Sequence, residues 1–352
     1  MKLRRWAAFA IFAAMGTAPA LAAPSCADLS LPAFPACERT RSGIIFAATA
    51  TEAKAAASAA EQGEASFSRH VAPVSAYAVL VGKDVAEATA ALRRSGYKVI
   101  LPWLNADARH QALEDSIRRA TEARLRAQGL SDDKVQAGVA QALAQVQGQQ
   151  QRDRLLTSYS AVAHELGHLW LMEAFWGNRK PNPGGAGHYG GPGPDWLDEA
   201  VAIAMEDEVL TAPRRQRFRD LWAGRVPEGV KSLAGFFAMD HPLKGVGSLV
   251  RSSGAQPGSS GVMVLTGEEV QKKLGVTADA GPNFYAQARA VADFLIERSG
   301  NPKILGEISA DLARGRTMEQ WVAANGRRNK LGKSMRDLEK EWRRWGEAKF
   351  GG

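Results

Sequence analysis

The segment 158–173, SYSAVAHELGHLWLME, constrains the fold more than any other part of this chain. Its apolar residues recur at steps of three and four, and no proline occurs between Gln151 and Gly177, so we predict a helix. Leucine and tryptophan make this helix apolar on most sides, as expected of a buried helix. His164 and His168 are four residues apart and therefore project from one face of it.

Two imidazoles one helical turn apart can bind the same tetrahedral Zn²⁺ at about 2.0–2.1 Å. Glu165 points beside that position, where it can accept a proton from a metal-bound water. The alternative is that two surface histidines meet by chance, and five letters alone do not decide. The apolar flanks favour the metal, because buried imidazoles without a metal or a hydrogen-bond partner are costly. We therefore expect one zinc ion at His164 and His168.

A catalytic zinc also needs a third protein ligand and an open position. Metzincins carry a glycine and a histidine at fixed steps after the second histidine, where this chain has Leu171 and Ala174. The segment 195–202, DWLDEAVA, instead resembles the second metal-binding helix of gluzincins, with its W-L-x-E-G/A-x-A signature. Ala200 replaces the commoner glycine, and the preceding loop is long and rich in glycine and proline. The resemblance implies Glu199 as third ligand.

The wider pattern from residue 151 onward resembles the MA-like peptidase domains of bacteria. This resemblance implies hydrolysis of peptide bonds, with Glu165 accepting a proton from the zinc-activated water. In such peptidases a phenol or imidazole outside the ligand set often stabilises the oxyanion, alongside zinc. The candidates here are Tyr285, which ranks first, His241, Tyr189 and His188.

Glu206 stands seven residues after Glu199. A helix predicted from Trp196 to Leu210 would place both on one face, two turns apart, where Glu206 could hydrogen-bond a ligating histidine. An ordinary surface glutamate is the equal alternative. An inactive, zinc-stabilised scaffold that binds peptides or envelope proteins is the alternative for the whole chain, although the presence of Glu165 gives it no support.

Residues 1–22 have a basic start, an apolar run and small residues at the end, which is typical of a secretory signal peptide cleaved after Ala22 or Ala23. The apolar run is too short for a transmembrane anchor, and we expect no membrane span after it. Export predicts a periplasmic or secreted protein, in which Cys26 and Cys37, the only cysteines, form a disulfide. Zinc ligation by the two cysteines is a minor alternative.

We predict an α+β, mostly helical fold: a small α/β segment with a helical excursion at 23–150, then a zincin-like helical domain at 151–352. The α/β segment contains strands at 74–81 and 97–101, around a helix at 85–94. The gluzincin resemblance implies an edge strand above the histidine helix that aligns an extended peptide, and we expect one of these two strands to be that strand. Other predicted helices are 47–68, 107–128, 131–150 and 284–297, and a last helix carries an apolar stripe from Leu331 to Trp345.

The formal net charge of +8 falls to about +5 without the predicted signal peptide. A balance this modest favours solubility over attraction to anionic polymers, because no long basic run occurs. We expect a peptide or protein substrate and no nucleic acid partner, since no nucleic-acid-binding module is recognisable. The oligomeric state does not follow from the sequence.

Overall fold

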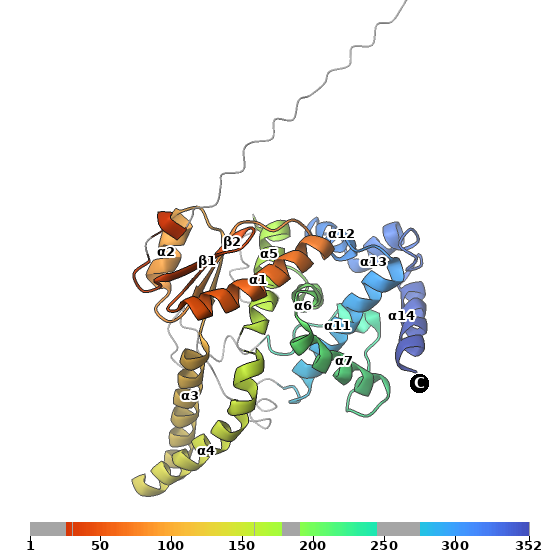
Figure 1. Cartoon of the computed structure of the whole chain (residues 1–352). Coiled ribbons are helices and arrows are strands. Elements are labelled where there is room, and N and C mark those ends of the chain that lie inside the picture. The colour runs from red at the N-terminus through yellow and green to blue at the C-terminus, as the bar shows by residue number, and fades with distance from the viewer. Residues whose placement is uncertain (1–25, 30, 158, 178–190, 245–274, 352) are drawn as a thin grey trace, which may run out of the picture.

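The computed structural model describes residues 26–29, 31–157, 159–177, 191–244 and 275–351. The described chain is α+β and mostly helical, with one small sheet near its N-terminal end, which confirms that fold class (Figure 1). The predicted signal peptide lies outside the described residues, as do His188 and Tyr189. No described helix is both long and apolar enough to span a bilayer.

The sheet has the strand order β1-β2-β3-β4, with β1 antiparallel to β2 and the other neighbours parallel. The two strands predicted from the sequence correspond to β3 and β4, in shorter and shifted forms. Strand β1 was missed because its sequence, ACER, contains neither β-branched nor aromatic residues. The strands are β1 Ala36–Arg39, β2 Gly43–Ala47, β3 Tyr77–Val81 and β4 Val99–Trp103.

Helices cover both faces of the sheet. Alternate residues of β2 and β3 face opposite sides, so that Ile45 and Val79 join one hydrophobic core while Ile44 and Leu80 join another. The helices α1 and α5 contribute to the first core, and α2 contributes to the second. Their bounds are α1 Ala50–His70, α2 Ala86–Arg94 and α5 Ser160–Trp176.

A glycine lets α1 and the histidine-bearing helix α5 pack closely. A Cβ on Gly63 of α1 would lie 2.8 Å from the Ala163 Cβ and 3.1 Å from its Cα. Any side chain at this position would therefore push the two helices apart. Since α1 also packs against β1 and β2, the contact fixes α5 relative to the sheet.

A hairpin of two helices, α3 (Ala106–Ala127) and α4 (Asp132–Thr157), joins β4 to α5. The two helices pack against each other and extend away from the sheet (Figure 1). Ile117, Val135 and Val139 are buried in the hairpin. The predicted domain boundary at residue 150 falls inside α4, so the helical excursion continues to within three residues of α5.

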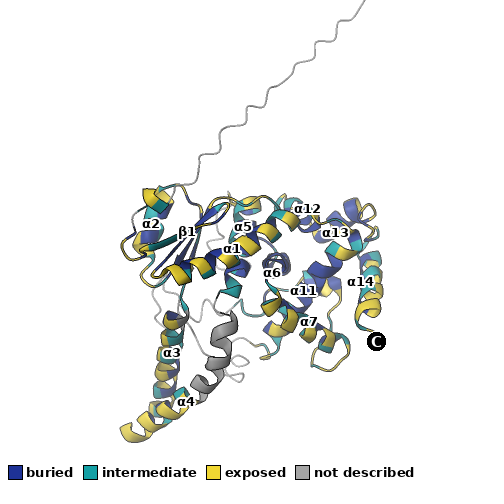
Figure 2. Ribbon diagram, in the orientation of Figure 1, coloured by how far each residue is buried: buried dark blue, intermediate teal, exposed yellow. Residues whose placement is uncertain are grey.

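Helix α6, every residue of which is buried, packs against α5, α8, α11 and α12 (Figure 2). Helix α11 packs against both α6 and α7, and α14 closes the assembly. Trp342 of α14 is fully buried against Phe218 and Phe294, so the predicted apolar stripe belongs to the core. These elements are α6 Asp195–Ala204, α7 Glu208–Trp222, α8 Leu233–Phe237, α11 Ala280–Ser299, α12 Ile304–Ala313, α13 Met318–Trp321, the π-helical turn η2 Val322–Gly326 and α14 Met335–Phe350.

The continuous helix predicted from Trp196 to Leu210 is wrong in its extent. Helix α6 ends at Ala204, and α7 begins at Glu208. The Asp207 side chain accepts a hydrogen bond from the backbone N–H of Leu210, which is the N-cap interaction that starts a new helix. Glu206 therefore lies in the break between two helices.

The N-terminal end of the described chain is tied to the sheet by a disulfide. Cys26, in the short 3-10 helix η1 (Cys26–Asp28), is bonded to Cys37 of β1. The bridge closes a short loop whose Phe34 is buried against the second core.

Candidate metal centre

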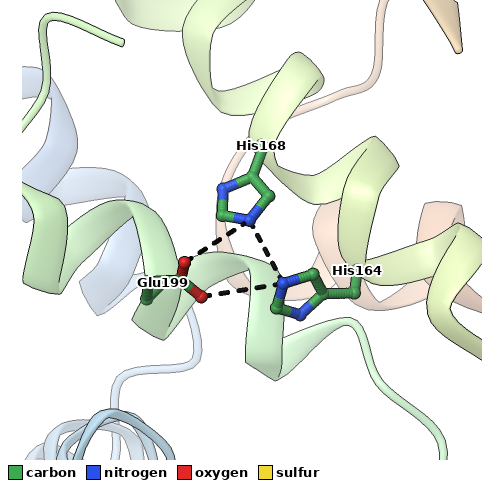
Figure 3. A group of neighbouring side chains, drawn as sticks. All are labelled: His164, His168 and Glu199. Carbon is green, nitrogen blue, oxygen red and sulfur yellow. Dashed lines mark hydrogen bonds and ion pairs between the residues drawn. The ribbon is translucent and has the colours of Figure 1, made fainter. Parts of the chain in front are cut away.

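Three side chains converge where α5 crosses α6. His164 and His168 project from α5, and Glu199 reaches them from α6 (Figure 3). One ligand atom of each lies within 4.8 Å of those of the other two, and no other His, Cys, Asp or Glu of the described chain joins the group. The sequence-predicted ligand set is thus brought together in space.

The spacing of these atoms suits a small tetrahedral cation. The His164 Nε2 lies 3.2 Å from the His168 Nε2 and 3.6 Å from Glu199 Oε2. Ligand atoms bound tetrahedrally at about 2.0–2.1 Å are separated from one another by about 3.3 Å. In addition, Glu199 Oε2 is buried and has no hydrogen-bond partner in the described chain. A buried carboxylate oxygen without a partner is costly, and a bound cation would remove that cost.

Two carboxylates orient the imidazoles from behind. The His168 Nδ1 is 2.7 Å from Asp198 Oδ1, and the His164 Nδ1 is 2.8 Å from Glu206 Oε1, although the latter angle departs from an ideal hydrogen bond. A carboxylate at Nδ1 places the ring proton there. The two Nε2 lone pairs then face each other, and they repel unless a proton or a metal ion lies between them.

The site carries more negative than positive charge. Glu165, Asp198, Glu199 and Glu206 surround two imidazoles, and Arg214 supplies one guanidinium. Burial alone would lower the pKa of His168, but Asp198 above all, with Glu199 and Glu165, outweighs burial and raises this pKa to about 10. The site therefore attracts positive charge, and a proton and a metal ion compete for the same place.

A glycine inside the histidine motif allows α5 and α6 to cross closely. A Cβ on Gly167 would lie 2.9 Å from the Ala202 Cα and 3.0 Å from the Met205 Cγ. The backbone of α6 could not stay in place against such a side chain. Since Glu199 is carried by α6, Gly167 helps to bring its carboxylate to the imidazoles.

Glu206 reaches the site from the break between α6 and α7, not from the helical face assumed in the sequence prediction. Its side chain is fully buried between His164 and Arg214. Arg214 of α7 donates two hydrogen bonds to its carboxylate, at 2.7 and 2.6 Å. Burial alone would raise the pKa of Glu206, but the close His164 ring and the hydrogen bonds from Arg214 hold this pKa below its usual value.

Of the predicted oxyanion candidates, Tyr285 and His241 lie in the described chain and contact each other. Their ring centroids are 5.5 Å apart, and the Arg214 guanidinium lies 4.8 Å from the Tyr285 ring centroid. Tyr285 stands in the second turn of α11, which begins at Ala280, not at the start of a helix. The His241 Nε2 lies 3.3 Å from Glu199 Oε1, so His241 stands beside the carboxylate ligand.

Glu165 is half-buried on α5 and outside the three-residue metal group. It follows His164 directly in the sequence, and its charge contributes to the raised pKa of His168. This position leaves Glu165 free of ligation.

One edge of the sheet lies beside α5, the helix that carries the two histidines. Of the two predicted edge-strand segments, β3 lies inside the sheet between β2 and β4. Strand β4 is the edge and packs against α5. Its exposed Pro102 has no N–H to donate, which is typical of a strand edge.

Sequence reasoning missed three side chains that complete the site: Asp198, Arg214 and Asp195, which binds the backbone N–H of His241 at 2.6 Å. Asp195 and Asp198 stand one turn apart on α6, the helix that also carries Glu199. Carboxylates in such positions often bind the second nitrogen of a metal-ligating histidine, so these two residues could have been predicted from the sequence. The role of Arg214 could not be predicted in this way. Arg214 reaches Glu206 only because the helix breaks between α6 and α7, and no sequence motif marks that break.

Comparison of the chain with protein families, curated proteins and solved structures finds no match. The function of this centre is therefore inferred from its own residues and their geometry.

Proposed function

We propose that this protein is an exported zinc metallopeptidase of the gluzincin type, with His164, His168 and Glu199 as ligands. The observation that carries the proposal is the convergence of two imidazoles and one carboxylate, from two helices, at the spacing of a tetrahedral cation. The nitrogen-rich set with one carboxylate suits zinc better than calcium or magnesium, which prefer oxygen ligands.

A zinc ion in this site would lower the pKa of a water in the open position to about 7 and polarise a substrate carbonyl. Glu165, outside the ligand set, accepts the proton from the water and later returns it to the leaving amine. Asp198 and Glu206 keep the two imidazoles oriented through their Nδ1 atoms. The edge strand β4 supports a peptide substrate, because its outer edge can pair with an extended chain.

The proposal is tested with Glu165→Gln, which keeps the size of the side chain and removes the proton acceptor. We expect zinc to remain bound while kcat/KM falls by at least about 10²–10⁴-fold, the usual effect of losing a general base. Cleavage is measured by mass spectrometry on a broad peptide library, which also identifies the preferred sequence, and zinc by elemental analysis.

Two variants serve as controls. Glu173→Gln removes another carboxylate of α5, which pairs with Lys98 at 3.1 Å, and should cleave as fast as wild type. Glu199→Ala should lose zinc. If the wild-type protein holds zinc but cleaves nothing in the library, the chain is a zinc-stabilised scaffold and not a peptidase. If Glu165→Gln cleaves as fast as wild type, Glu165 is not the general base and the proposed mechanism is wrong.

A further inference from the structure

His241 lies next to Glu199 but outside the three residues that can hold a metal. Its side chain is fully buried, in the segment that follows α8. Aromatic rings of α11 enclose the imidazole, with centroids 5.1 Å away for Phe284 and 5.5 Å away for Tyr285. A buried imidazole in this position is held in one orientation.

Two backbone contacts fix His241 and its tautomer. Its own N–H donates to Asp195 Oδ2 at 2.6 Å, and the backbone N–H of Leu243 donates to its Nδ1 at 3.1 Å. A ring nitrogen that accepts a hydrogen bond carries no proton, so the proton of the neutral ring is on Nε2. The Nε2–H group therefore faces Glu199 Oε1 at 3.3 Å, although the angle of this contact departs from that of an ideal hydrogen bond.

The two oxygens of Glu199 have different surroundings. Oε1 lies 3.3 Å from the His241 Nε2 and 3.9 Å from the His168 Nε2, whereas Oε2 is buried without a hydrogen-bond partner among the described residues and lies 3.6 Å from the His164 Nε2. We propose that His241 is a positioning residue that binds Oε1 and presents Oε2 as the single ligand atom of Glu199. The inference rests on the proposed zinc centre and deepens it.

This arrangement has two effects on a metal. A carboxylate held at one oxygen cannot rotate freely or bind the ion through both oxygens, so less conformational entropy is lost when the metal binds. An imidazole that donates Nε2–H to a carboxylate is also not a fourth ligand, which leaves the open position to water and substrate. In this role His241 keeps one coordination position of the metal open, as in catalytic zinc sites, and does not close it, as a fourth protein ligand does in structural sites.

The test compares zinc affinity, by competition with a chelator, in full-length variants of His241. His241→Phe keeps an aromatic ring and removes the donor, and we expect affinity to fall by about 10–100-fold. His241→Gln places an amide N–H near the position of Nε2 and should recover affinity to within about threefold of wild type. His241→Asn keeps an acceptor for the Leu243 N–H but does not reach Glu199, so it should be as weak as the Phe variant.

Phe284→Leu is the matched control, because it alters the packing around the imidazole and leaves the donor intact. Its zinc affinity should be unchanged, and Co²⁺ absorption spectra of all variants should show the wild-type coordination number. Wild-type affinity in His241→Phe and His241→Asn, or equal losses in His241→Gln and His241→Phe, would overturn the inference. A Co²⁺ spectrum that loses one ligand in His241→Phe would overturn it as well, by making His241 a ligand.

These outcomes are separate from the peptidase proposal. If the variants rank as expected but the wild-type protein cleaves no peptide, the positioning role stands and the peptidase proposal fails. If the wild-type protein binds no zinc, both fail.

Discussion

In each imidazole of the proposed centre, the Nδ1 atom, which would not bind the metal, lies next to a carboxylate. The two carboxylates differ in their surroundings. Asp198 precedes Glu199 on α6 and reaches His168 at 2.7 Å. Glu206 has a second partner, because Arg214 binds both of its oxygens. The orientation of His164 therefore depends on an arginine from a third helix.

Arg214 is expected to stabilise the fold as well as the metal site. Arg214→Met would leave the fully buried Glu206 carboxylate without its guanidinium. Removing one partner of a buried ion pair typically costs about 3–5 kcal/mol of unfolding free energy. Because the Arg214 side chain is about one-fifth exposed, we expect a loss near the lower end, measured by denaturant unfolding of the zinc-free protein.

The double variant Arg214→Met/Glu206→Gln separates the ion pair from packing. It removes both charges, so it should lose less stability than the sum of the two single variants. Strictly additive losses would show that the two side chains act independently.

At the scale of elements, the crossing of α5 and α6 brings the three proposed ligands together. Gly167 lies at that crossing, between Glu165 and His168 in the sequence, and α6 approaches it too closely for a side chain. One short stretch of α5 thus contains the two proposed histidine ligands and the proposed base. It also contains the glycine against which α6, the helix of Glu199, packs.

Gly167→Ala measures the importance of this crossing. Alanine favours a helix by up to about 1 kcal/mol over glycine, but its Cβ would meet the Ala202 backbone at 2.9 Å, and overpacking of this kind costs about 1–3 kcal/mol. We expect a net loss of unfolding free energy and weaker zinc binding, since α6 must shift with Glu199. Both are measured by denaturant unfolding and chelator competition.

Gly281→Ala of α11 is the control, because its Cβ would meet only Leu243 at 3.8 Å, an ordinary contact. It should leave zinc affinity unchanged and should not lower the unfolding free energy, because alanine adds helix propensity here without a clash. Tighter zinc binding in Gly167→Ala than in wild type would contradict the role assigned to the crossing.

The helices α1, α2, α3 and α11 follow closely from periodicity and propensity, because each has an apolar face or a composition that a helix satisfies locally. The break at Met205–Asp207 could not be predicted this way, since the residues around it would also suit a continuous helix. Strand β1 depends on its pairing with β2 and carries no local signal. In the site, the histidines and Glu199 form motifs, whereas Arg214 and the contact of His241 with Glu199 arise only from tertiary packing.

At the scale of the whole molecule, the proposed metal centre lies within a continuous core that joins one face of the sheet to the helices of the C-terminal half. That core contains Val79 of β3, Trp170 of α5 and Trp342 of α14. Because one core spans the predicted boundary at residue 150, we expect the two predicted domains to unfold together in a single cooperative transition.

The disulfide lies on the other face of the sheet, next to the second core. Cys26→Ser/Cys37→Ser should reduce the unfolding free energy by about 3 kcal/mol or less, the chain-entropy value for a loop of about a dozen residues. Zinc affinity should be unchanged, because the first core separates the bridge from the metal. Denaturant unfolding and chelator competition measure the two quantities, and a loss of zinc in the double variant would link the bridge to the site.

The hairpin of α3 and α4 has a consequence for the order in which the chain folds. Helix α5 must find the edge of the sheet at β4, yet a long stretch of chain lies between Trp103 and Ser160. The entropy of closing a flexible loop rises with its length, but two helices that pair with each other form early and bring their outer ends together. We therefore expect the hairpin to shorten the effective search for the contact between α5 and β4. A flexible linker of equal length in its place would slow refolding more than it lowers stability.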